Sequence, residues 1–255
     1  QWHDGYTVWK TSNWPIADMV LNNETGVWSY TIPLPCGTWN YKFYIGGDIG
    51  SDVDDYKGAT VTWDPNNKPI LYDYEAGKLV NEEYLSSIFV PYDPIRQLHS
   101  SNRMEEAPLY GQNGRTMFID VTSSSNNHPA RCGVYLPYQF DINRADPYPI
   151  LILMHGGGGT ESSWFNNGLI NILDNMISQR RLEPMVVITP NGSDFEWNRP
   201  IILDAVVNDI LPYAVKNFNV STNMNKRAFG GLSLGGATTM YAYFHQTEQF
   251  QYYLN

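Results

Sequence analysis

The stretch Arg227–Phe244 reads RAFGGLSLGGATTMYAYF, and it predicts a strand over 227–229, a tight turn and a helix over 237–244. Ser233 stands in the turn, with Gly231 two residues before it and Gly235 two residues after it. A serine nucleophile at such a strand-to-helix turn is held in a strained conformation that exposes its hydroxyl group, and small flanking residues leave room for the turn. The positive end of the following helix favours developing negative charge. In a chain with 21 glycines this pattern also arises by chance.

A second motif, HGGGG at His155–Gly159, directly follows the apolar run Pro149–Met154. Glycine N–H groups at the carboxyl end of a buried strand can face a tetrahedral oxyanion, which is the second half of an acyl-transfer site. The alternatives are a phosphate-binding loop and a flexible turn. A phosphate loop would need GxxxxGK[ST], or GxGxxG leading into a helix, and neither is present. The two motifs together predict serine-hydrolase chemistry with Ser233 as the nucleophile.

The residues around both motifs alternate between strand and helix patterns. Alternating apolar residues predict a hairpin over Thr116–Val121 and Cys132–Tyr138. Unbroken apolar runs at Pro149–Met154 and Met185–Thr189 are typical of parallel strands that are buried on both faces. Helical periodicity covers two further segments, 167–179 and 201–218. We therefore expect an open, mostly parallel sheet covered by helices over residues 116–255.

The first third of the chain has a different pattern. Short alternating runs separated by Gly, Pro, Asn and Asp predict four strands, at Tyr6–Trp9, Gly26–Leu34, Thr38–Ile45 and Ala59–Trp63. This spacing is typical of a small antiparallel β-sandwich, which we place at residues 1–85. Residues 86–115 are polar and irregular, with three prolines, and are expected to be a linker that wraps on a neighbouring domain. The predicted fold therefore has two domains.

Composition and charge exclude several classes of protein. The chain of 255 residues is 42% hydrophobic and 16% charged, so it can bury a sizeable core. Its net charge of −10 leaves no positive surface for nucleic acid or an anionic membrane. No apolar run approaches the ~20 residues that a membrane span needs. Cys36 and Cys132 are too few for a disulfide framework, and whether they pair is left open. Neither they nor His3, His99 and His128 have metal-ligand spacing, so no metal or organic cofactor is expected.

Four segments resemble the esterase-D-type α/β-hydrolases of carbohydrate esterase family 1, which includes feruloyl and acetyl xylan esterases. The segments are LILMHGGGGTESSWF, PMVVITPNG, NDILPYAVKNFNVS and KRAFGGLSLGGATTMYAYF, and the resemblance covers about residues 130–255. It implies that Ser233 is the nucleophile and that the N–H groups of Gly157 and Leu234 form the oxyanion hole. It also implies that His155 is a structural residue of its loop and not the general base.

The N-terminal segments TSNWPIADM, ETGVWSYTIPLPCGTWNYKFYIGG and WDPNNKP resemble carbohydrate-binding module family 48, an early-set immunoglobulin-like sandwich whose members bind α-glucans. The resemblance places Trp14 at the sugar-stacking tryptophan and Lys42 at a polar contact. Val61 stands where a second stacking tryptophan is usual, and Trp63 follows on the same strand face. Trp28 and Tyr30 are expected to pack inside the sheet or support it. The alternative for Trp14 is simple packing. The high aromatic content, with 8 Trp and 18 Tyr, also suits sugar stacking.

A serine of this kind needs a histidine base and an orienting carboxylate, which in α/β-hydrolases follow it in the chain. Only His245 and Glu248 are available after Ser233, and both lie at the far end of the predicted helix, pointing away from the serine. We therefore expect a hydrolase domain that is truncated at its C-terminus, with acid and base beyond Asn255 or on another chain. The first strand of the N-terminal module is likewise expected to lie before Gln1.

These features predict a secreted, extracellular serine esterase whose signal peptide is not in this sequence. It would hydrolyse feruloyl esters, or alternatively acetyl esters, on plant xylan through an acyl-enzyme, so the expected partner is feruloylated arabinoxylan. Trp164 and Trp197 are candidates for binding the acyl ring. A siderophore esterase shares the two-domain architecture. From a different class, the chain can be read as a carbohydrate-binding protein whose hydrolase domain is inert.

Overall fold

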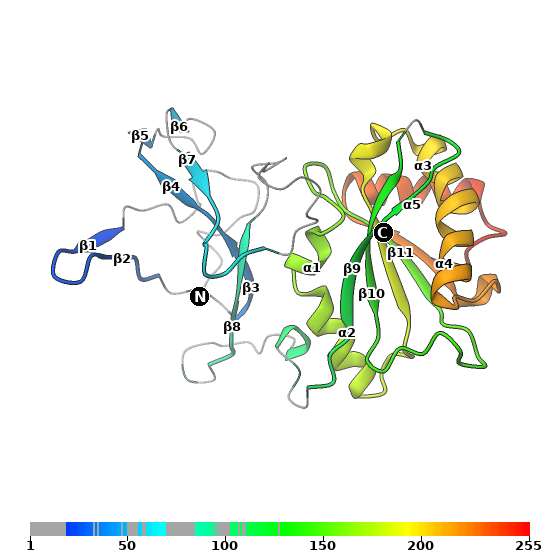
Figure 1. Cartoon of the computed structure of the whole chain (residues 1–255), viewed down its shortest axis with the longest axis horizontal. Coiled ribbons are helices and arrows are strands. Elements are labelled where there is room, and N and C mark those ends of the chain that lie inside the picture. Colours follow the sequence, from blue (N-terminus) through cyan, green and yellow to red (C-terminus); the bar gives the residue numbers. More distant parts are fainter. Residues whose placement is uncertain are drawn as a thin grey trace. The chain divides into compact units, whose positions relative to one another are not determined.

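The computed structural model describes residues 19–32, 34, 36–46, 48–49, 56–57, 60–69, 85–93, 95, 103–106, 108, 111–126 and 128–255. These residues fall into two compact units (Figure 1). The N-terminal unit comprises the described residues up to Pro69 and from 85 to Arg103, and the α/β unit comprises those from Met104 to Asn255. Each unit is described by itself. In these ranges no helix is both long enough and apolar enough to cross a bilayer.

The α/β unit is built on a six-stranded mixed sheet of order β14-β13-β11-β12-β10-β9. Its strands are β9 (Arg115–Val121), β10 (Ala130–Leu136), β11 (Ile150–Met154), β12 (Val186–Pro190), β13 (Arg227–Gly231) and β14 (Tyr252–Leu254). β9 and β10 form the expected antiparallel hairpin, and β10 also pairs antiparallel with β12. The other four strands run parallel to one another. The predicted α/β class with a mostly parallel central sheet is therefore confirmed.

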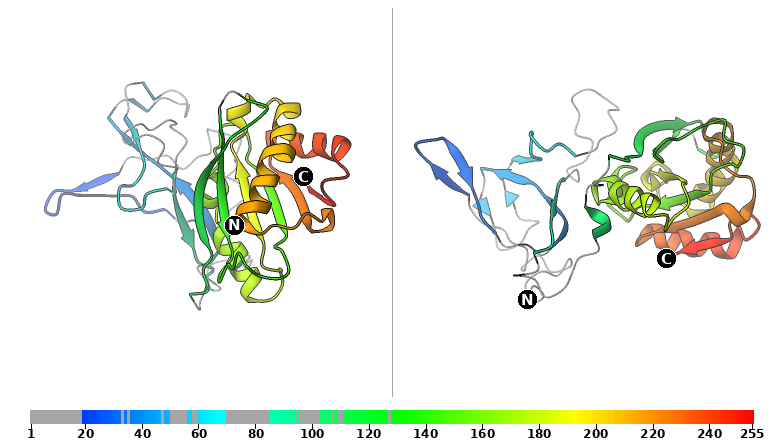
Figure 2. Two further views of the ribbon diagram at one scale, coloured as in Figure 1. Left: turned by 45° about the vertical axis from the view of Figure 1, so that its right-hand side comes forward. Right: turned by 90° about the horizontal axis from the view of Figure 1, so that it is seen from below.

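Helices cover both faces of this sheet (Figures 1 and 2). α1 (Ser163–Asn166) and α2 (Leu169–Ser178) lie on one face. The other face carries α3 (Arg199–Ala205), the π-helical segment η4 (Val206–Ile210), α4 (Leu211–Phe218) and α5 (Leu234–His245). Single turns of 3-10 helix occur at η2 (Arg103–Glu105), η3 (Gly192–Phe195) and η5 (Met224–Lys226).

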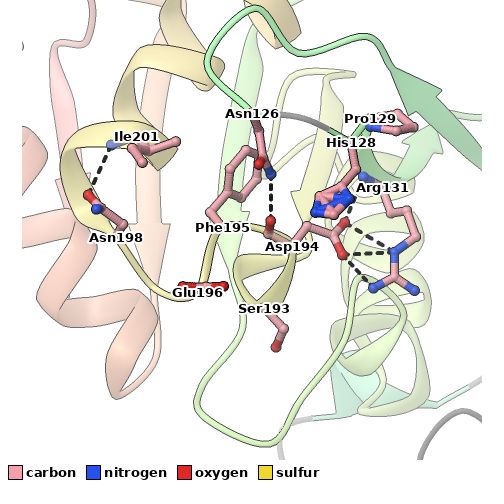
Figure 3. A pocket seen from close by; sticks show the side chains of 10 residues that line it. All are labelled: Asn126, His128, Pro129, Arg131, Ser193, Asp194, Phe195, Glu196, Asn198 and Ile201. Atoms are coloured by element: carbon pink, nitrogen blue, oxygen red, sulfur yellow. Dashed lines mark hydrogen bonds and ion pairs between the residues drawn. The ribbon is translucent and has the colours of Figure 1, made fainter.

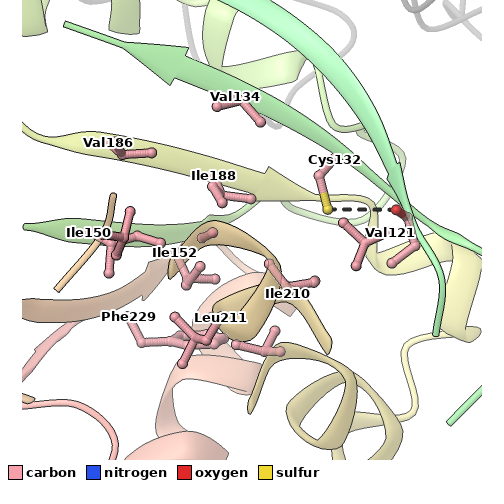
Figure 4. Close-up of a cluster of buried hydrophobic side chains, with 14 of the residues drawn as sticks. Val121, Cys132, Val134, Ile150, Ile152, Val186, Ile188, Ile210, Leu211 and Phe229 are labelled. Carbon is pink, nitrogen blue, oxygen red and sulfur yellow. Dashed lines mark hydrogen bonds between the residues drawn. The ribbon is translucent and has the colours of Figure 1, made fainter. Parts of the chain in front are cut away.

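The alternation of side chains along β11 produces two separate cores. Ile150, Ile152 and Met154 point to the larger cluster, where they pack with α3, η4, α4 and α5. Figure 4 shows this cluster, with Ile210 of η4 and Leu211 of α4 among the side chains of the strands. Leu151 and Leu153 point to the opposite face and pack with α1 and α2. All five side chains of β11 are buried, as expected for a strand covered on both faces.

The long helix expected over 201–218 is present, but it contains a π-helical segment. Within η4 the N–H of Leu211 bonds to the carbonyl of Val206, five residues back. Pro212 follows at once and has no N–H to donate, so the regular ladder cannot pass through it. The widened turn before the proline accommodates this break. β14 was not predicted, because three residues at a sheet edge carry too short a pattern.

The described part of the N-terminal unit contains four two-stranded antiparallel pairs. These are β1 (Val20–Asn22) with β2 (Val27–Ser29), β3 (Gly37–Tyr41) with β8 (Ser86–Val90), β4 (Phe43–Ile45) with β7 (Thr60–Thr62), and β5 (Asp48–Ile49) with β6 (Tyr56–Lys57). The antiparallel pairing agrees with the sequence. A complete sandwich stays a prediction, since one of the expected strands, Tyr6–Trp9, lies outside the described residues.

Two expectations for the first hundred residues need correction. The first five residues of the expected linker, Ser86–Val90, form strand β8, because their alternating residues pair with β3 in the register Trp39↔Ile88. Trp28 and Tyr30 do not pack inside a sheet: they are 58% and 45% exposed on the β1–β2 hairpin. No third element among the described residues covers that hairpin.

Candidate active site

Ser233 lies between the end of β13 and the start of α5, at the carboxyl end of the sheet. Its backbone has φ 54° and ψ −113°, which is a strained conformation for a residue with a side chain. The side chain is exposed, and so are those of Leu232 and Leu234 on either side of it. The predicted turn is therefore present, and it presents a hydroxyl group at the surface.

The two glycines that flank Ser233 are required by close packing. A Cβ atom on Gly231 would overlap the backbone of Gly235. A Cβ atom on Gly235 would lie 2.6 Å from the carbonyl oxygens of both Met154 and His155, at the end of β11. The turn can therefore form only if both positions lack a side chain, and the same packing brings the turn against the neighbouring strand.

This packing places the glycine-rich loop beside the serine. A Cβ atom on Gly156 would lie 3.4 Å from the Cβ of Ser233, and one on Gly157 would lie 3.0 Å from Cδ1 of Leu234. Leu234 is the first residue of α5, so its N–H has no partner within the helix. The structure thus brings together the three residues that were predicted for catalysis, Ser233, Gly157 and Leu234.

His155 supports the loop and does not contact the serine hydroxyl. Its Nε2 accepts a hydrogen bond of 3.0 Å from the N–H of Gly192, so its Nδ1 carries the proton and donates to the carbonyl of Gly156 at 2.7 Å. Burial lowers the pKa of His155, which favours this neutral ring. Trp197 packs edge-on against the ring, with centroids 5.1 Å apart. These contacts tie the glycine-rich loop to the end of β12.

A cluster of buried polar side chains adds to the contacts between the glycine-rich loop and the end of β12. The sequence did not predict the residues of this cluster. Glu161 is 1% exposed. Its Oε2 accepts a hydrogen bond of 2.6 Å from Nδ2 of Asn191, and its backbone carbonyl accepts one of 2.5 Å from the hydroxyl of Thr189. No hydrogen-bond partner for Oε1 is present among the described residues. Burial raises the pKa of Glu161. Residues 155–161 are consequently held at both ends.

In the described part of the chain, no histidine forms a hydrogen bond with the Ser233 hydroxyl. His155 is bonded as above, and His245 lies at the other end of α5. There Nδ1 of His245 bonds to the carbonyl of Tyr241 at 2.8 Å, and the two rings stack. The geometry agrees with the expectation that neither His245 nor its neighbour Glu248 acts on Ser233.

The two tryptophans considered for acyl binding occupy supporting positions. Trp197 contacts His155 and packs so closely on Gly192 that a Cβ there would lie 2.6 Å from its ring. Trp164 in α1 packs against the smaller core, and its Nε1 is buried without a partner among the described residues.

The sugar contacts predicted in the N-terminal unit are described in part. Lys42 lies between β3 and β4, with its Nζ 5.2 Å from the centre of the Tyr44 ring. The β4–β7 register pairs Phe43 with Thr62, so Lys42 and Trp63 are the next residues beyond the same end of this strand pair. Trp14 lies outside the described residues. The role of Lys42 and Trp63 in binding stays a prediction.

The described residues contain no cluster of three or more His, Cys, Asp or Glu side chains that could hold a metal ion. Cys132 is a fully buried thiol whose Sγ lies 3.8 Å from the carbonyl of Ala130. Burial raises the pKa of this thiol well above its ordinary value, so it is not a reactive nucleophile.

Comparison with known proteins identifies the family. A family model described as "Putative esterase" matches residues 123–254. The chain belongs to this esterase family. The match spans the sheet from β10 to β14, with both the glycine-rich loop and Ser233. The resemblance of residues 130–255 to esterases is therefore confirmed, whereas the resemblance of the N-terminal unit to carbohydrate-binding module family 48 stays a prediction.

Two curated relatives are similar to this chain over about half of its length. Endo-1,4-beta-xylanase Y of Acetivibrio thermocellus is 30% identical over 148 residues, which are 53% of this chain and 14% of the relative. The endo-1,4-beta-xylanase/feruloyl esterase of Xylanibacter ruminicola is 29% identical over 152 residues, which are 55% of this chain and 21% of the relative. The chain thus spans about a seventh to a fifth of these relatives.

Solved structures share the fold of the α/β unit. A serine-to-alanine mutant of the feruloyl esterase module from Clostridium thermocellum, complexed with sinapinate, is 29% identical and has a TM-score of 0.51. The match covers 64% of this chain and 58% of that one. The CE1 ferulic acid esterase of Anaeromyces mucronatus has a TM-score of 0.55 at 17% identity, covers 60% of this chain and 61% of that one, and supports the fold alone.

Proposed function

We propose that this esterase is a serine carboxylic ester hydrolase that releases feruloyl groups from plant xylan. The observation that carries the proposal is the strained, exposed Ser233 packed against the glycine-rich loop at Gly156 and Gly157. The curated relatives and the solved feruloyl esterase module support the substrate class. Acetyl esters on the same polysaccharide are the alternative substrate.

In the proposed reaction, Oγ of Ser233 attacks the ester carbonyl while a general base takes its proton. The N–H groups of Gly157 and Leu234 hold the oxyanion of the tetrahedral intermediate. The C–O bond of the sugar ester then breaks, the sugar hydroxyl leaves with the proton, and the acyl group stays on Ser233. Water attacks the acyl-enzyme in the same way and releases the acid and the free serine.

The general base and its carboxylate are assigned to residues outside the described part of the chain. The described histidines near Ser233 are engaged elsewhere, with His155 bonded to Gly156 and Gly192. The proposal therefore requires a histidine that reaches Ser233 from the solvent side, where Leu232 and Leu234 leave the hydroxyl accessible. The extracellular location and the polysaccharide partner belong to the same proposal, because xylan lies outside the cell.

A second candidate is a carbohydrate-binding protein with an inert hydrolase unit. The position of Lys42 and Trp63 just beyond the same end of the β4–β7 pair, with the Tyr44 ring beside the lysine, favours a sugar contact in the N-terminal unit. Retained xylan or α-glucan binding by a natural protein without ester hydrolysis would select this candidate.

The direct test compares the natural full-length protein with its Ser233→Ala variant on methyl ferulate and on acetylated xylan. We expect the variant to lose at least about a thousandfold in turnover with unchanged thermal unfolding, because the nucleophile is lost and an exposed hydroxyl is removed. Full activity of the variant would overturn the assignment. The preferred substrate of the unchanged protein decides between feruloyl and acetyl esters.

A further inference from the structure

A pocket of about 560 Å³ with a mixed polar and apolar lining opens at the carboxyl end of β12, outside the catalytic residues described above. Its walls come from the segment before β10 and from the chain between β12 and α3 (Figure 3). His128 and Arg131 lie on one side, Asn198 and Ile201 lie on the other, and Asp194 lies between them (Figure 3). A volume of this size suits a ligand of several rings.

The floor of the pocket is preorganised by a charged pair. The guanidinium of Arg131 bonds to both carboxylate oxygens of Asp194, with Nε distances of 3.0 and 3.1 Å, and the Arg131 N–H adds a bond of 3.0 Å. Asn126 Nδ2 donates to the carbonyl of Asp194 at 2.6 Å. The segment that leads to the pocket is fixed as well, since both the N–H and the hydroxyl of Ser124 bond to Asp209. A ligand therefore meets a shape that is already formed.

The Arg131–Asp194 ion pair also determines which class of ligand the pocket can bind. Because Arg131 is neutralised by Asp194, and the exposed carboxylate of Glu196 lies at the pocket, a phosphate or another anion is disfavoured. His128, Ser193 and Glu196 are exposed and have no hydrogen bond from their side chains to other described residues. Together they offer donors and acceptors. Pro129 and Ile201 add apolar surface. Neutral hydroxyl groups on a ring with an apolar face satisfy both kinds of surface.

The pocket and Ser233 lie at the same end of the sheet. β12 and β13 flank β11 in parallel, so their carboxyl ends are ~10 Å apart at the usual strand spacing. The two sites are also connected through contacts: Gly192, next to Ser193 of the pocket, donates to His155, which begins the glycine-rich loop beside Ser233. One oligosaccharide can therefore reach the pocket while its ester lies at the serine.

We propose that this pocket binds the sugar residues that adjoin the esterified sugar, so that it selects oligosaccharide esters over simple alkyl esters. The proposal rests on the proposed function for its substrate, xylan. Its binding step involves no chemistry and is independent of the nucleophile. Glu196 and His128 are its contact residues, since both are exposed at the pocket and their substitution leaves the Arg131–Asp194 floor in place.

The first test is a calorimetric titration of the natural protein with unesterified xylotriose. Saturable binding is expected, with Glu196→Gln and His128→Ala each weakening it about fivefold, the usual effect of one lost hydrogen bond. Glu248→Gln, a matched substitution of an exposed carboxylate away from the pocket, should leave the affinity unchanged. A sugar site in the N-terminal unit would not respond to any of these variants. No binding, or equal binding by all variants, would overturn the proposal.

The second test uses kinetics. Glu196→Gln should raise KM about fivefold for a feruloylated arabinoxylotriose, while kcat on that substrate and both constants on methyl ferulate stay unchanged. Equal KM values on the oligosaccharide ester would contradict the proposal.

Xylotriose binding at the pocket without ester hydrolysis would retain this inference and overturn the proposed function. Methyl ferulate hydrolysis together with equal xylotriose affinities of the unchanged protein and the pocket variants would retain the proposed function and overturn this inference. Circular dichroism and thermal unfolding verify that each variant is folded.

Discussion

The two units of the molecule differ in what their strands bury. In the α/β unit, the strand residues Val134, Ile152, Ile188 and Phe229 are fully enclosed between sheet and helices. Among the side chains of the N-terminal unit whose burial the structure describes, no aliphatic or aromatic one other than a proline is fully buried. There Val20, Val27 and Trp28 are all more than half exposed. The strands of both units contain similar hydrophobic residues. In the α/β unit these residues are enclosed by other side chains, whereas on the β1–β2 hairpin they face the solvent.

This difference explains where a strained active site can form. A backbone conformation such as that of Ser233 persists only when its surroundings hold it in place, and here the close packing of Gly235 on the end of β11 does so. The exposed β1–β2 hairpin of the N-terminal unit presents its side chains without such support. The following predictions test this contrast, and they begin with the largest expected effect.

Truncation of the α/β core should cost the most stability. Phe229 is 0% exposed and packs edge-on against Phe250 with ring centres 5.4 Å apart. Phe229→Ala leaves a cavity on the central strand β13, so we expect the free energy of unfolding to fall by about 3–5 kcal/mol. Urea unfolding followed by circular dichroism measures this loss. A change below about 1 kcal/mol would show that β13 is not in a packed core.

A side chain added at the Ser233 turn should lower the free energy of unfolding less than Phe229→Ala does. It should lower the esterase activity more. In Gly235→Val the new side chain would meet the carbonyl oxygens of Met154 and His155, so the turn must move away from β11. We expect a loss of about 1–3 kcal/mol in stability together with loss of esterase activity. Ferulate release and thermal unfolding, measured on one preparation, separate the two effects. A stable and active valine variant would contradict the packing described here.

Glu161 should make stability depend on pH. Its pKa is raised by burial, so the folded state holds this proton more tightly than the unfolded state does. Its stabilising effect is therefore greatest below the ordinary Glu pKa of ~4.3 and is lost as pH rises towards the raised value.

The glutamine variant tests this sign. Because Glu161→Gln cannot ionise, its stability relative to the unchanged protein should increase as pH rises above the ordinary Glu pKa of ~4.3. Urea unfolding at several pH values measures the difference. Glu161→Ala should instead be less stable throughout, since Asn191 Nδ2 loses its buried acceptor. A difference between Glu161→Gln and the unchanged protein that does not vary with pH would contradict the assigned pKa direction.

The smallest effect is expected in the N-terminal unit. Trp28 is 58% exposed on the β1–β2 hairpin, so Trp28→Ala should change the free energy of unfolding by less than about 0.5 kcal/mol. The same urea titration used for Phe229→Ala measures it. A loss similar to that of Phe229→Ala would mean that Trp28 is covered, as the sequence had indicated.

These contrasts also show what sequence patterns can and cannot predict. The turn at Ser233 and the buried strand β11 were predictable, because short motifs and apolar runs encode them locally. The hydrogen bond between Glu161 and Asn191 was not, since it joins residues 30 apart whose proximity depends on the pairing of β11 with β12. Strand β8 was hidden for the same reason: its partner β3 lies far back in the chain.

The pocket beside β12 belongs with these non-local features. Arg131 and Asp194 are separated by 63 residues, and only the sheet brings them into contact. No local motif marks either residue as part of a binding site. The sequence therefore predicted the turn that carries Ser233 but not the pocket beside β12.

The most direct test of the central claim, that Ser233 of the α/β unit is an acylated nucleophile, is mass spectrometry of the natural protein quenched in acid during turnover of p-nitrophenyl acetate. We predict one acetyl group on the peptide that contains Ser233, and none on that peptide in Ser233→Ala. Turnover with an unmodified Ser233 peptide, or with the acetyl group on another residue, would contradict the account.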